Sequence, residues 1–446
     1  MTGRGTEASG GEESGRTRWR SGSRRRGHLL LGVLCAGVTA FVATVPYHRD
    51  WFDLWVYYDA VRHWTGADGG LRGAGLYDYR VPGETYGFTY PPFAALCVLP
   101  LSLLTWPVAV TAGVMANLGA VALILRRLAE PVIRRHGLDR WTSYAVILCL
   151  LALLEPVYDS VSFGQVNLLL LALVLTDARL LVSGSRWAGI GVGLAAAVKL
   201  TPAIFVGHLL VTRRWRAAGT AAAVAVGATL LAVWCAPGAS HAYWTSALWD
   251  TSRIGDLSYV SNQSWQGVLA RLSAPAEPSR LGWAFGVAAV VGAWAYRVDR
   301  ARAAGDVRGG IALTGAAACL VSPVTWVHHL VWLLPALAVL ADRALEPPRR
   351  GRPLAVAVAV YVILCSYVVW LWRYDVSGID GFIGGNAFVW TALALLLALP
   401  LRRPDPEQRR LDGADPARSG HDPGDGAGRR TDDHDVDGGH GAAVLP

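Results

Sequence analysis

Residues 188–212 read AGIGVGLAAAVKLTPAIFVGHLLVT, an apolar run that is interrupted near its middle by Lys199 and by the pair Thr201-Pro202. Arginines bound the run on both sides: Arg186, Arg213, Arg214 and Arg216. Arginine-rich loops stay on the cytoplasmic side of a membrane, so both ends of the run should lie there. The run is too short for two full crossings of about 20 residues each. We therefore predict a hairpin of two short helices whose turn, at Lys199, lies near the outer leaflet.

The same alternation of apolar runs and arginine clusters continues along most of the 446-residue chain. The sequence is 53% hydrophobic and 17% charged, and its mean hydropathy is +0.34. A soluble domain carries about 25% charged residues, so we predict an integral membrane protein. The net charge of +8 comes from arginines between apolar spans. The positive-inside rule explains these arginines without nucleic acid as a partner.

Placing the arginine clusters on one side of the membrane yields an all-α bundle of about 11–12 transmembrane helices. Besides the hairpin, we predict crossings at residues 29–45, 105–126, 142–156, 166–182, 217–236, 282–297, 309–323, 327–342, 353–372 and 386–401. Residues 93–104 are predicted to form a helix at the outer interface, because Pro100 and Pro107 break that apolar stretch.

The domain organisation follows from this topology. Residues 28–401 are predicted to form one polytopic domain in the cell membrane, with outer loops at 47–91 and 237–281. Residues 1–27 and 402–446 are low-complexity segments that cannot bury enough apolar surface to order themselves. We predict both segments as disordered and cytoplasmic. No cleavage site is evident after the first apolar stretch, which we expect to remain as an anchor.

Ionisable residues are costly at membrane depth and usually functional, and they collect at the predicted outer surface. Asp53 shares a helical face with Tyr57, and a carboxylate at the mouth of a bundle can act as general base on a hydroxyl group. A helix N-cap or a solvated interfacial charge is the alternative for Asp53. Lys199 is the only lysine of the chain. It either extends to the interface or meets an anion such as a lipid phosphate.

Tyrosine, amide and imidazole side chains are candidates for sugar or acceptor binding, because their polar groups pair with hydroxyl groups. The candidates are Tyr57, Tyr90, Gln165, Asn167, Asn262, Gln263, His328 and His329. For Tyr90 an interfacial aromatic belt is an equally good interpretation, and helix-end polarity is the alternative for the amides and histidines. Because the two histidines are adjacent, we expect at most one to face a given site, which disfavours a two-histidine metal site.

The sequence lacks the motifs of several enzyme classes. No P-loop, dinucleotide-binding glycine motif, HExxH or GxSxG occurs in a suitable context. The six cysteines lie in apolar stretches without metal-type spacing. We predict no metal and no cofactor. No predicted inner loop is long enough for a nucleotide-sugar domain, which favours a sugar donor carried by a lipid phosphate.

Several short motifs stand in a fixed order over about residues 28–400. They are Asp53-Leu-Trp-Val-Tyr-Tyr58, Phe88-Thr-Tyr-Pro-Pro-Phe-Ala-Ala95, Gly164-Gln-Val-Asn-Leu168, Gly193-Leu-Ala-Ala-Ala-Val-Lys-Leu-Thr-Pro202 with Arg213-Arg-Trp-Arg216, Ser261-Asn-Gln-Ser264 and Ser322-Pro-Val-Thr-Trp-Val-His-His329. Each motif is weak alone, whereas the ordered set is fairly specific. The set resembles glycosyltransferase family 87, the multipass polyprenyl-phosphate-mannose-dependent alpha-mannosyltransferases of actinobacteria.

The resemblance implies a GT-C-type fold with an outward-facing active site, a polyprenyl phosphate mannose donor and a lipid or glycan acceptor. It implies inverting transfer, in which an aspartate of the first outer loop deprotonates the acceptor hydroxyl; Asp53 matches that position. The lysine of the short hairpin, Lys199, would contact the donor phosphate and offset the charge that develops on it. The identity of the acceptor is left open.

Two other functions compete with the transferase. A lipid-linked sugar flippase or transporter often shows two repeated halves with broken helices in both, and here one broken hairpin, at 188–212, has no evident counterpart. A noncatalytic scaffold for envelope assembly leaves the polar clusters without a role. The long outer loops also favour an outward catalytic pocket.

Overall fold

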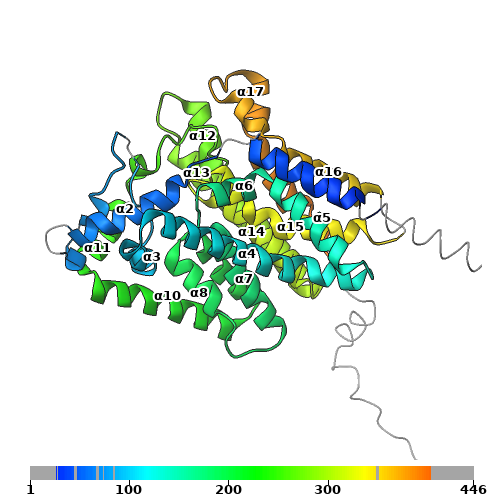
Figure 1. Ribbon diagram of the computed structural model, residues 1–446, viewed down its shortest axis with the longest axis horizontal. Coiled ribbons are helices and arrows are strands. Elements are labelled where there is room, and N and C mark those ends of the chain that lie inside the picture. Colours follow the sequence, from blue (N-terminus) through cyan, green and yellow to red (C-terminus); the bar gives the residue numbers. More distant parts are fainter. Residues whose placement is uncertain are drawn as a thin grey trace, which may run out of the picture. The chain divides into compact units, whose positions relative to one another are not determined.

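The computed structural model describes residues 27, 29–44, 48–66, 70–73, 75–83, 86–347 and 351–402. These residues form helices and loops, and no strand occurs among them, so the predicted all-α class is confirmed (Figure 1). The terminal segments that the sequence predicts as disordered lie outside the described residues, apart from Gly27 and Arg402.

Four of the described helices are long and apolar enough to cross a membrane. They are α4 (Trp106–Arg135), α10 (Trp215–Cys235), α13 (Arg280–Ala303) and the continuous Val327–Ala344, which joins the 3-10 helix η7 (Val327–Leu333) to α15 (Leu334–Ala344). Two bent pairs raise the number to six: α5 (Arg140–Leu153) with α6 (Glu155–Ser162), and α17 (Gly378–Gly384) with α18 (Ala387–Ala398). The membrane-protein class is thus confirmed.

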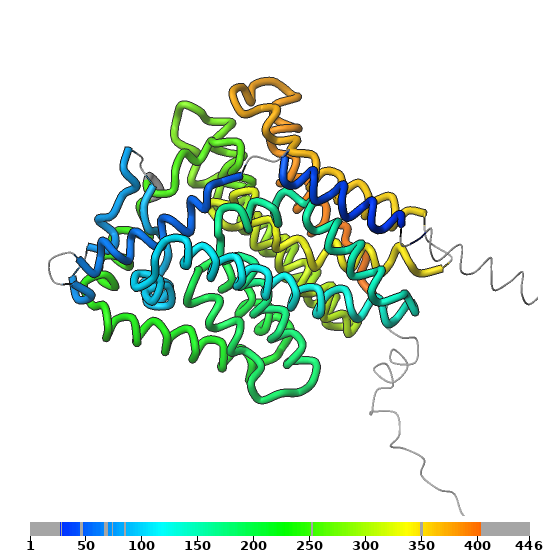
Figure 2. The backbone as a smooth tube through the Cα atoms, viewed as in Figure 1, coloured from blue at the N-terminus to red at the C-terminus, as the bar shows by residue number. Residues whose placement is uncertain are grey.

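Shorter apolar helices complete the bundle. They are Leu29–Thr44, Pro92–Leu103, Thr201–Val211, α14 (Val307–Val321) and α16 (Gly351–Cys365). The helix Leu29–Thr44 packs beside α5, where the sulfur atoms of Cys35 and Cys149 are 3.6 Å apart (Figure 2). The predicted 11–12 crossings are reached only when these shorter helices also cross.

The centre of the bundle is α14, which packs against α13, α15 and α18. Nearly every residue from Gly309 to Leu320 is buried. A helix that is apolar all round is stable only when other helices surround it. Since α14 has 15 residues, its central position explains how a helix shorter than a typical span is held in place.

The hairpin predicted at 188–212 is present as two short helices. α8 (Ile190–Val198) ends before Lys199, whose backbone is extended (φ −147°, ψ 134°), and α9 (Ile204–Val211) follows the short 3-10 helix η4 (Thr201–Ala203). A proline removes the helical hydrogen bond to the carbonyl four residues earlier, which here belongs to Val198, the last residue of α8, and it is tolerated in the first turn of the next helix. Pro202 therefore accounts for the break between the two helices.

Several boundaries differ from the prediction, among them the end of α4 and the start of α6. α4 continues past the predicted end at residue 126 to Arg135, through Pro131, and its last turn is held by an ion pair from Arg134 to Glu130 at 2.6 Å. The crossing predicted at 142–156 ends with α5 at Leu153, and residues Glu155–Ser162 form a separate helix, α6, bent by 75° from α5. Pro156 occupies the first turn of α6, where its missing N–H costs nothing, so a new helix begins there.

The two predicted outer loops contain helices of their own. Residues 47–91 hold α2 (Phe52–Gly66), η1 (Gly70–Arg72) and η2 (Gly75–Tyr77), followed by α3 (Pro92–Val98) and η3 (Leu99–Leu103). Residues 237–281 hold α11 (Pro237–Ala242), η5 (Tyr243–Ala247), η6 (Thr251–Ile254) and α12 (Trp265–Ser273). α2 and α11 lie together at one end of the bundle (Figure 1). Their shared aromatic core includes Trp64, Tyr77, Phe88 and Tyr243.

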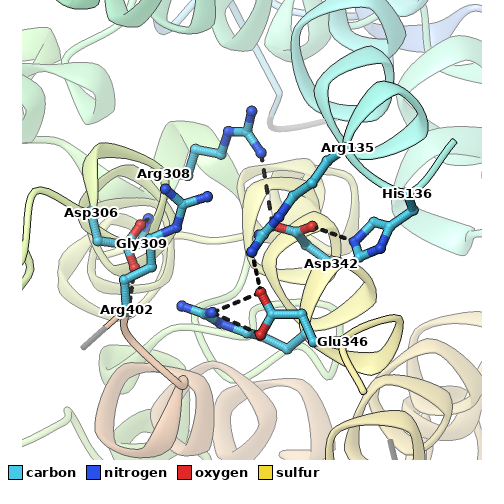
Figure 3. Close-up of polar contacts among 9 residues, drawn as sticks. Arg135, His136, Asp306, Arg308, Gly309, Asp342, Glu346 and Arg402 are labelled. Carbon is cyan, nitrogen blue, oxygen red and sulfur yellow. Dashed lines mark hydrogen bonds and ion pairs between the residues drawn. The ribbon is translucent and has the colours of Figure 1, made fainter. Parts of the chain in front are cut away.

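A cluster of ion pairs joins α4 to α15. The buried carboxylate of Asp342 is 2.8 Å from the Arg135 guanidinium and 2.9 Å from His136 Nε2 (Figure 3). Arg135 also contacts Glu346, one turn further along the chain (Figure 3). Asp342 is buried and would be left without a partner if these cations were removed, so this cluster fixes the end of α4 against α15.

Candidate active site

A cavity of about 660 Å³ opens between α2, the segment before α3, the junction of α6 with α7 (Asn167–Val182), the Lys199 turn and the segment before η7. It gathers residues that lie far apart in the sequence. Seven of the ten candidate site residues line it: Asp53, Tyr57, Tyr90, Gln165, Lys199, His328 and His329.

Asp53 enters the cavity from the first turn of α2. The start of this helix is held to the end of α6 by two backbone hydrogen bonds. Trp51 N donates to Ser162 O and Leu54 N donates to Phe163 O, each over 3.0 Å. Since Gln165 follows directly, these hydrogen bonds bring the carboxylate and the amide to the same wall of the cavity.

Gly164 makes this close approach possible. Its φ is +69°, a conformation that strains residues with a side chain. A Cβ atom at this position would lie 2.5 Å from the Cβ of Leu54, which is less than a van der Waals contact. The glycine therefore determines how near α2 can lie to the turn that carries Gln165.

Lys199 reaches the cavity from the break between α8 and α9. Its ammonium nitrogen donates to Asn167 Oδ1 over 2.9 Å and to the Tyr90 hydroxyl over 3.3 Å. It also lies 2.9 Å from His329 Nε2, and 5.1 Å from the centre of the Tyr90 ring. Among the described residues, no carboxylate lies within ion-pair distance of this nitrogen, so its charge is solvated only by neutral groups.

A chain of hydrogen bonds connects Lys199 with Asp53. The Tyr57 hydroxyl donates to the Tyr90 hydroxyl over 2.9 Å, and the Tyr90 hydroxyl donates to Gln165 Oε1 over 3.1 Å. The other end of the Gln165 amide hydrogen-bonds Asp53. Asp53 and Lys199 are thus held in one network through Gln165 and Tyr90.

The Asp53 carboxylate is poised to take up a proton. Burial raises its pKa from 3.8 to about 6, against the lowering effects of the Gln165 hydrogen bond and the positive charge of Lys199. Oδ2 of Asp53 is buried and has no hydrogen-bond partner among the described residues. A buried acceptor without a partner is unfavourable, so a substrate hydroxyl group fits this position.

Three candidate residues lie behind the wall of the cavity. Asn167 is fully buried and contacts both Lys199 and Gln165, so it holds the other two in position. Asn262 accepts from Thr325 N at 3.0 Å and donates to Leu257 O at 3.1 Å. Gln263 Nε2 donates to the carbonyls of Val260 and Gly385, and Gln263 Oε1 accepts from the backbone amides of Phe388 and Val389. The side chains of Asn262 and Gln263 therefore bind the backbone and stabilise the fold around the site.

The two histidines differ from the expectation that only one faces the site, since both line the cavity. They belong to η7, a 3-10 helix rather than an α-helix, and their rings stack edge to face with centres 4.6 Å apart. His329 contacts Lys199, whereas His328 Nε2 is buried and has no hydrogen-bond partner among the described residues. In that part of the chain, no group of three His, Cys, Asp or Glu residues could hold a metal ion.

The sequence did not point to Arg49 and Asp159, which also line the cavity. Arg49 Nε donates to Asp159 Oδ1 over 3.3 Å. The guanidinium also lies over the rings of Phe163 and Trp370, 5.5 Å and 5.3 Å from their centres. The available signal was the pair of acidic residues Glu155 and Asp159 between apolar spans, because such residues are rarely without a function or a partner.

Comparison with known proteins identifies the family. The model of glycosyltransferase family 87 matches residues 88–323. A polyprenol-phosphate-mannose-dependent alpha-(1-2)-phosphatidylinositol pentamannoside mannosyltransferase of Mycolicibacterium smegmatis is 35% identical over 343 residues, 74% of this chain and 78% of that protein. A polyprenol-phosphate-mannose-dependent alpha-(1-2)-phosphatidylinositol mannoside mannosyltransferase of Mycobacterium tuberculosis is 32% identical over 424 residues, 87% of this chain and 94% of that protein.

No solved structure matches the chain. The family match covers more than half of the sequence, and the relatives are matched over most of their own length. The matched region contains the Tyr90, Gln165 and Lys199 side chains of the cavity, and the family resemblance drawn from the motifs is confirmed. This membrane protein belongs to glycosyltransferase family 87.

Proposed function

We propose that the protein transfers a mannose-type sugar from polyprenyl phosphate to a lipid or glycan acceptor at the outer face of the cell membrane. One observation carries this proposal: an aspartate with an unpartnered buried oxygen and a lysine without a carboxylate partner belong to one network in one cavity. The names of the relatives supply the donor and suggest a phosphatidylinositol mannoside as acceptor.

In this mechanism Asp53 is the general base. The acceptor hydroxyl donates a hydrogen bond to Asp53 Oδ2, its oxygen attacks the anomeric carbon of the sugar, and its proton passes to the carboxylate. The bond between that carbon and the phosphate oxygen breaks, and its electron pair leaves with the polyprenyl phosphate. A base with a pKa of about 6 is mostly deprotonated at neutral pH and still able to accept a proton.

Lys199 acts on the leaving group. The phosphate gains negative charge as the bond to the sugar breaks, and a fixed cation in a site with little water stabilises that charge. Asn167 and His329 orient the ammonium group, since both contact it at 2.9 Å. The donor phosphate would therefore occupy the part of the cavity beside the hairpin turn.

The remaining polar groups of the cavity provide contacts for hydroxyl groups. His328 Nε2 lacks a partner among the described residues, and Tyr57, Tyr90 and Gln165 line the same cavity. Hydroxyl and imidazole groups donate and accept hydrogen bonds, as sugar hydroxyls require. We assign these side chains to the sugar or to the acceptor.

The substitution Asp53→Asn tests the base. We expect transfer from radiolabelled polyprenyl phosphate mannose to membrane lipids to fall by about 100-fold or more, which is the usual contribution of a general base. Asp59→Asn is the matched control, because Asp59 lies on the same helix but does not line the cavity. It should keep its activity. Undiminished transfer by a correctly inserted Asp53→Asn protein would eliminate Asp53 as the base.

The substitution Lys199→Met tests the phosphate contact. The side-chain volume is similar and the charge is lost, so the KM for the lipid-phosphate donor should rise and kcat should fall, while the KM for the acceptor stays nearly unchanged. Lys199→Arg keeps the charge and is expected to retain more activity than Lys199→Met. Equal kinetics of Lys199→Met and the unsubstituted protein would leave Lys199 without a role in catalysis.

A further inference from the structure

A second cavity, of about 520 Å³, is lined by the other ends of α14 and of the continuous helix Val327–Ala344, which both also line the active-site cavity. α7 begins at Asn167, which contacts Lys199, and ends at Val182, which lines this second cavity. Its 16 residues correspond to about 24 Å at 1.5 Å per residue. The second cavity is therefore separate from the site of sugar transfer.

The second cavity is strongly basic. Its lining contains five arginines and two carboxylates: Arg126, Arg127, Arg134, Arg179, Arg308, Glu130 and Asp342. Both carboxylates are already engaged. Glu130 accepts from Arg134 and from the Tyr144 hydroxyl, and Asp342 binds Arg135 and His136 (Figure 3). Arg308 reaches Asp342 only at 3.9 Å. The arginines thus leave an excess of positive charge facing the cavity.

Three of these arginines have no carboxylate within ion-pair distance in the part of the chain that the structure describes: Arg126, Arg127 and Arg179. Nε of Arg127 is buried and lacks any hydrogen-bond partner there. A buried donor without an acceptor is unfavourable, and neighbouring guanidinium groups repel one another. An anion with several acceptor oxygens would accept a hydrogen bond from Arg127 Nε and would also reduce the repulsion between the guanidinium groups.

The rest of the lining is apolar and contains no aromatic side chain: its members include Leu128, Val132, Leu175, Val307, Ile311 and Val339. A nucleotide base would find no ring to stack on. Val182 is 61% exposed at the outside of the bundle. Guanidinium groups beside an apolar wall match a ligand that carries a phosphate and hydrocarbon together. Basic pockets between transmembrane helices bind lipid head groups in this way.

We infer that this cavity binds the phosphate of an anionic phospholipid, with Arg127 and Arg179 as its main contacts. The acyl chains follow the apolar wall towards Val182. Arginine presents a planar array of donors that matches phosphate oxygens. This inference does not depend on the proposed transfer reaction, because none of the residues that line the second cavity lines the active-site cavity.

The test uses the full-length protein in a neutral detergent and measures binding of dioleoyl phosphatidylglycerol by native mass spectrometry. In Arg127→Gln/Arg179→Gln the affinity should fall by about thirtyfold, since each arginine near a lipid phosphate contributes about a fivefold factor. The matched control is Arg214→Gln/Arg216→Gln, because these two arginines are exposed and lie outside the cavity. It should bind the lipid like the unsubstituted protein. Equal weakening in both double variants would overturn the inference.

Two further ligands identify the source of the phosphate. Dioleoyl phosphatidylcholine, which has the same phosphate but no net charge, should bind much more weakly than phosphatidylglycerol. Inorganic phosphate should not displace phosphatidylglycerol at millimolar concentration, and displacement would overturn the lipid as ligand. Arg179 is exposed, so Arg179→Gln alone, with an expected loss of about fivefold, keeps the test valid if the double variant does not fold.

Discussion

At the scale of single residues, the only lysine of the chain lies in a different structural setting from the arginines of the second cavity. The arginines that line the second cavity belong to helices, whereas Lys199 is placed at a helix break, where Tyr90, Asn167 and His329 contact it. Lysine presents a compact charge that can contact one phosphate oxygen closely, and arginine presents a broad fork. The neutral partners orient the ammonium group without neutralising it, which leaves its charge available to a substrate.

The pKa of Asp53 predicts how transfer depends on pH. Because burial raises this pKa to about 6, the base is deprotonated above pH 7 and becomes protonated as the pH falls through 6. The value of kcat/KM for the acceptor should therefore fall about tenfold per pH unit below about pH 5.5. Initial rates between pH 4.5 and 8 in detergent measure this profile.

A control separates titration from unfolding. The protein should be returned to pH 7.5 after each low-pH incubation, and full recovery of the rate shows that the loss is reversible protonation. A midpoint near 4, the ordinary value for an aspartate, would show that burial does not act on the catalytic base in the way described.

At the scale of elements, the site depends on how closely α2 meets the turn after α6. Gly164→Ala adds a methyl group where the backbone has a positive φ and where Leu54 Cβ is 2.5 Å away. We expect a loss of stability of about 1–3 kcal/mol, as for other strained backbone positions. We also expect lower transfer activity, because α2 carries Asp53. Thermal unfolding in detergent and the mannosyl transfer assay measure the two effects.

Gly184→Ala is the matched control for this substitution. Gly184 has nearly the same φ, +67°, but no atom lies within 4 Å of the added Cβ, and the residue is outside the cavity. It should lose stability through backbone strain alone and keep its specific activity. If Gly164→Ala and Gly184→Ala behaved alike in both assays, the close approach of α2 would not matter for catalysis.

The hairpin shows which features a sequence reveals on its own. Its length, the flanking arginines and the Lys199-Leu-Thr-Pro202 interruption predicted two short helices with a turn at the lysine, and the structure contains them. α6 was not predicted, because Glu155 and Asp159 interrupt the apolar run by which a crossing is recognised. Both carboxylates are buried, with Trp370 and Arg49 as partners. Those partners are more than 100 residues away in sequence, and periodicity carries no information about such pairs.

The sequence predicted which residues line the candidate site better than it predicted what each of them contacts. Polar side chains near predicted helix ends marked seven residues that do line the cavity. The same signal also selected Asn262 and Gln263, whose amides bind the backbone instead. An amide looks alike in the sequence whether it contacts a ligand or a loop, and only the packing separates the two cases.

At the scale of the whole molecule, the two cavities at opposite ends of α7 differ in character. The active-site cavity is lined by one lysine, two arginines, two aspartates and two histidines, and the second cavity by five arginines and two carboxylates. The positive-inside rule assigns the arginine-rich end to the cytoplasm, so the proposed transfer site would face outward. A lipid-bound donor at the outer leaflet could then enter without crossing the protein.

Cysteine labelling in intact cells measures this orientation. In a protein whose six cysteines are replaced, we predict that Ala276→Cys, exposed in the loop before α13, reacts with a membrane-impermeant maleimide added from outside. Ser183→Cys, exposed at the end of α7 beside the basic cavity, should react only after the cells are permeabilised. Both variants must retain mannosyl transfer to show that the fold is intact. The reverse labelling pattern would place Asp53 and Lys199 towards the cytoplasm, where the donor at the outer leaflet could not reach them.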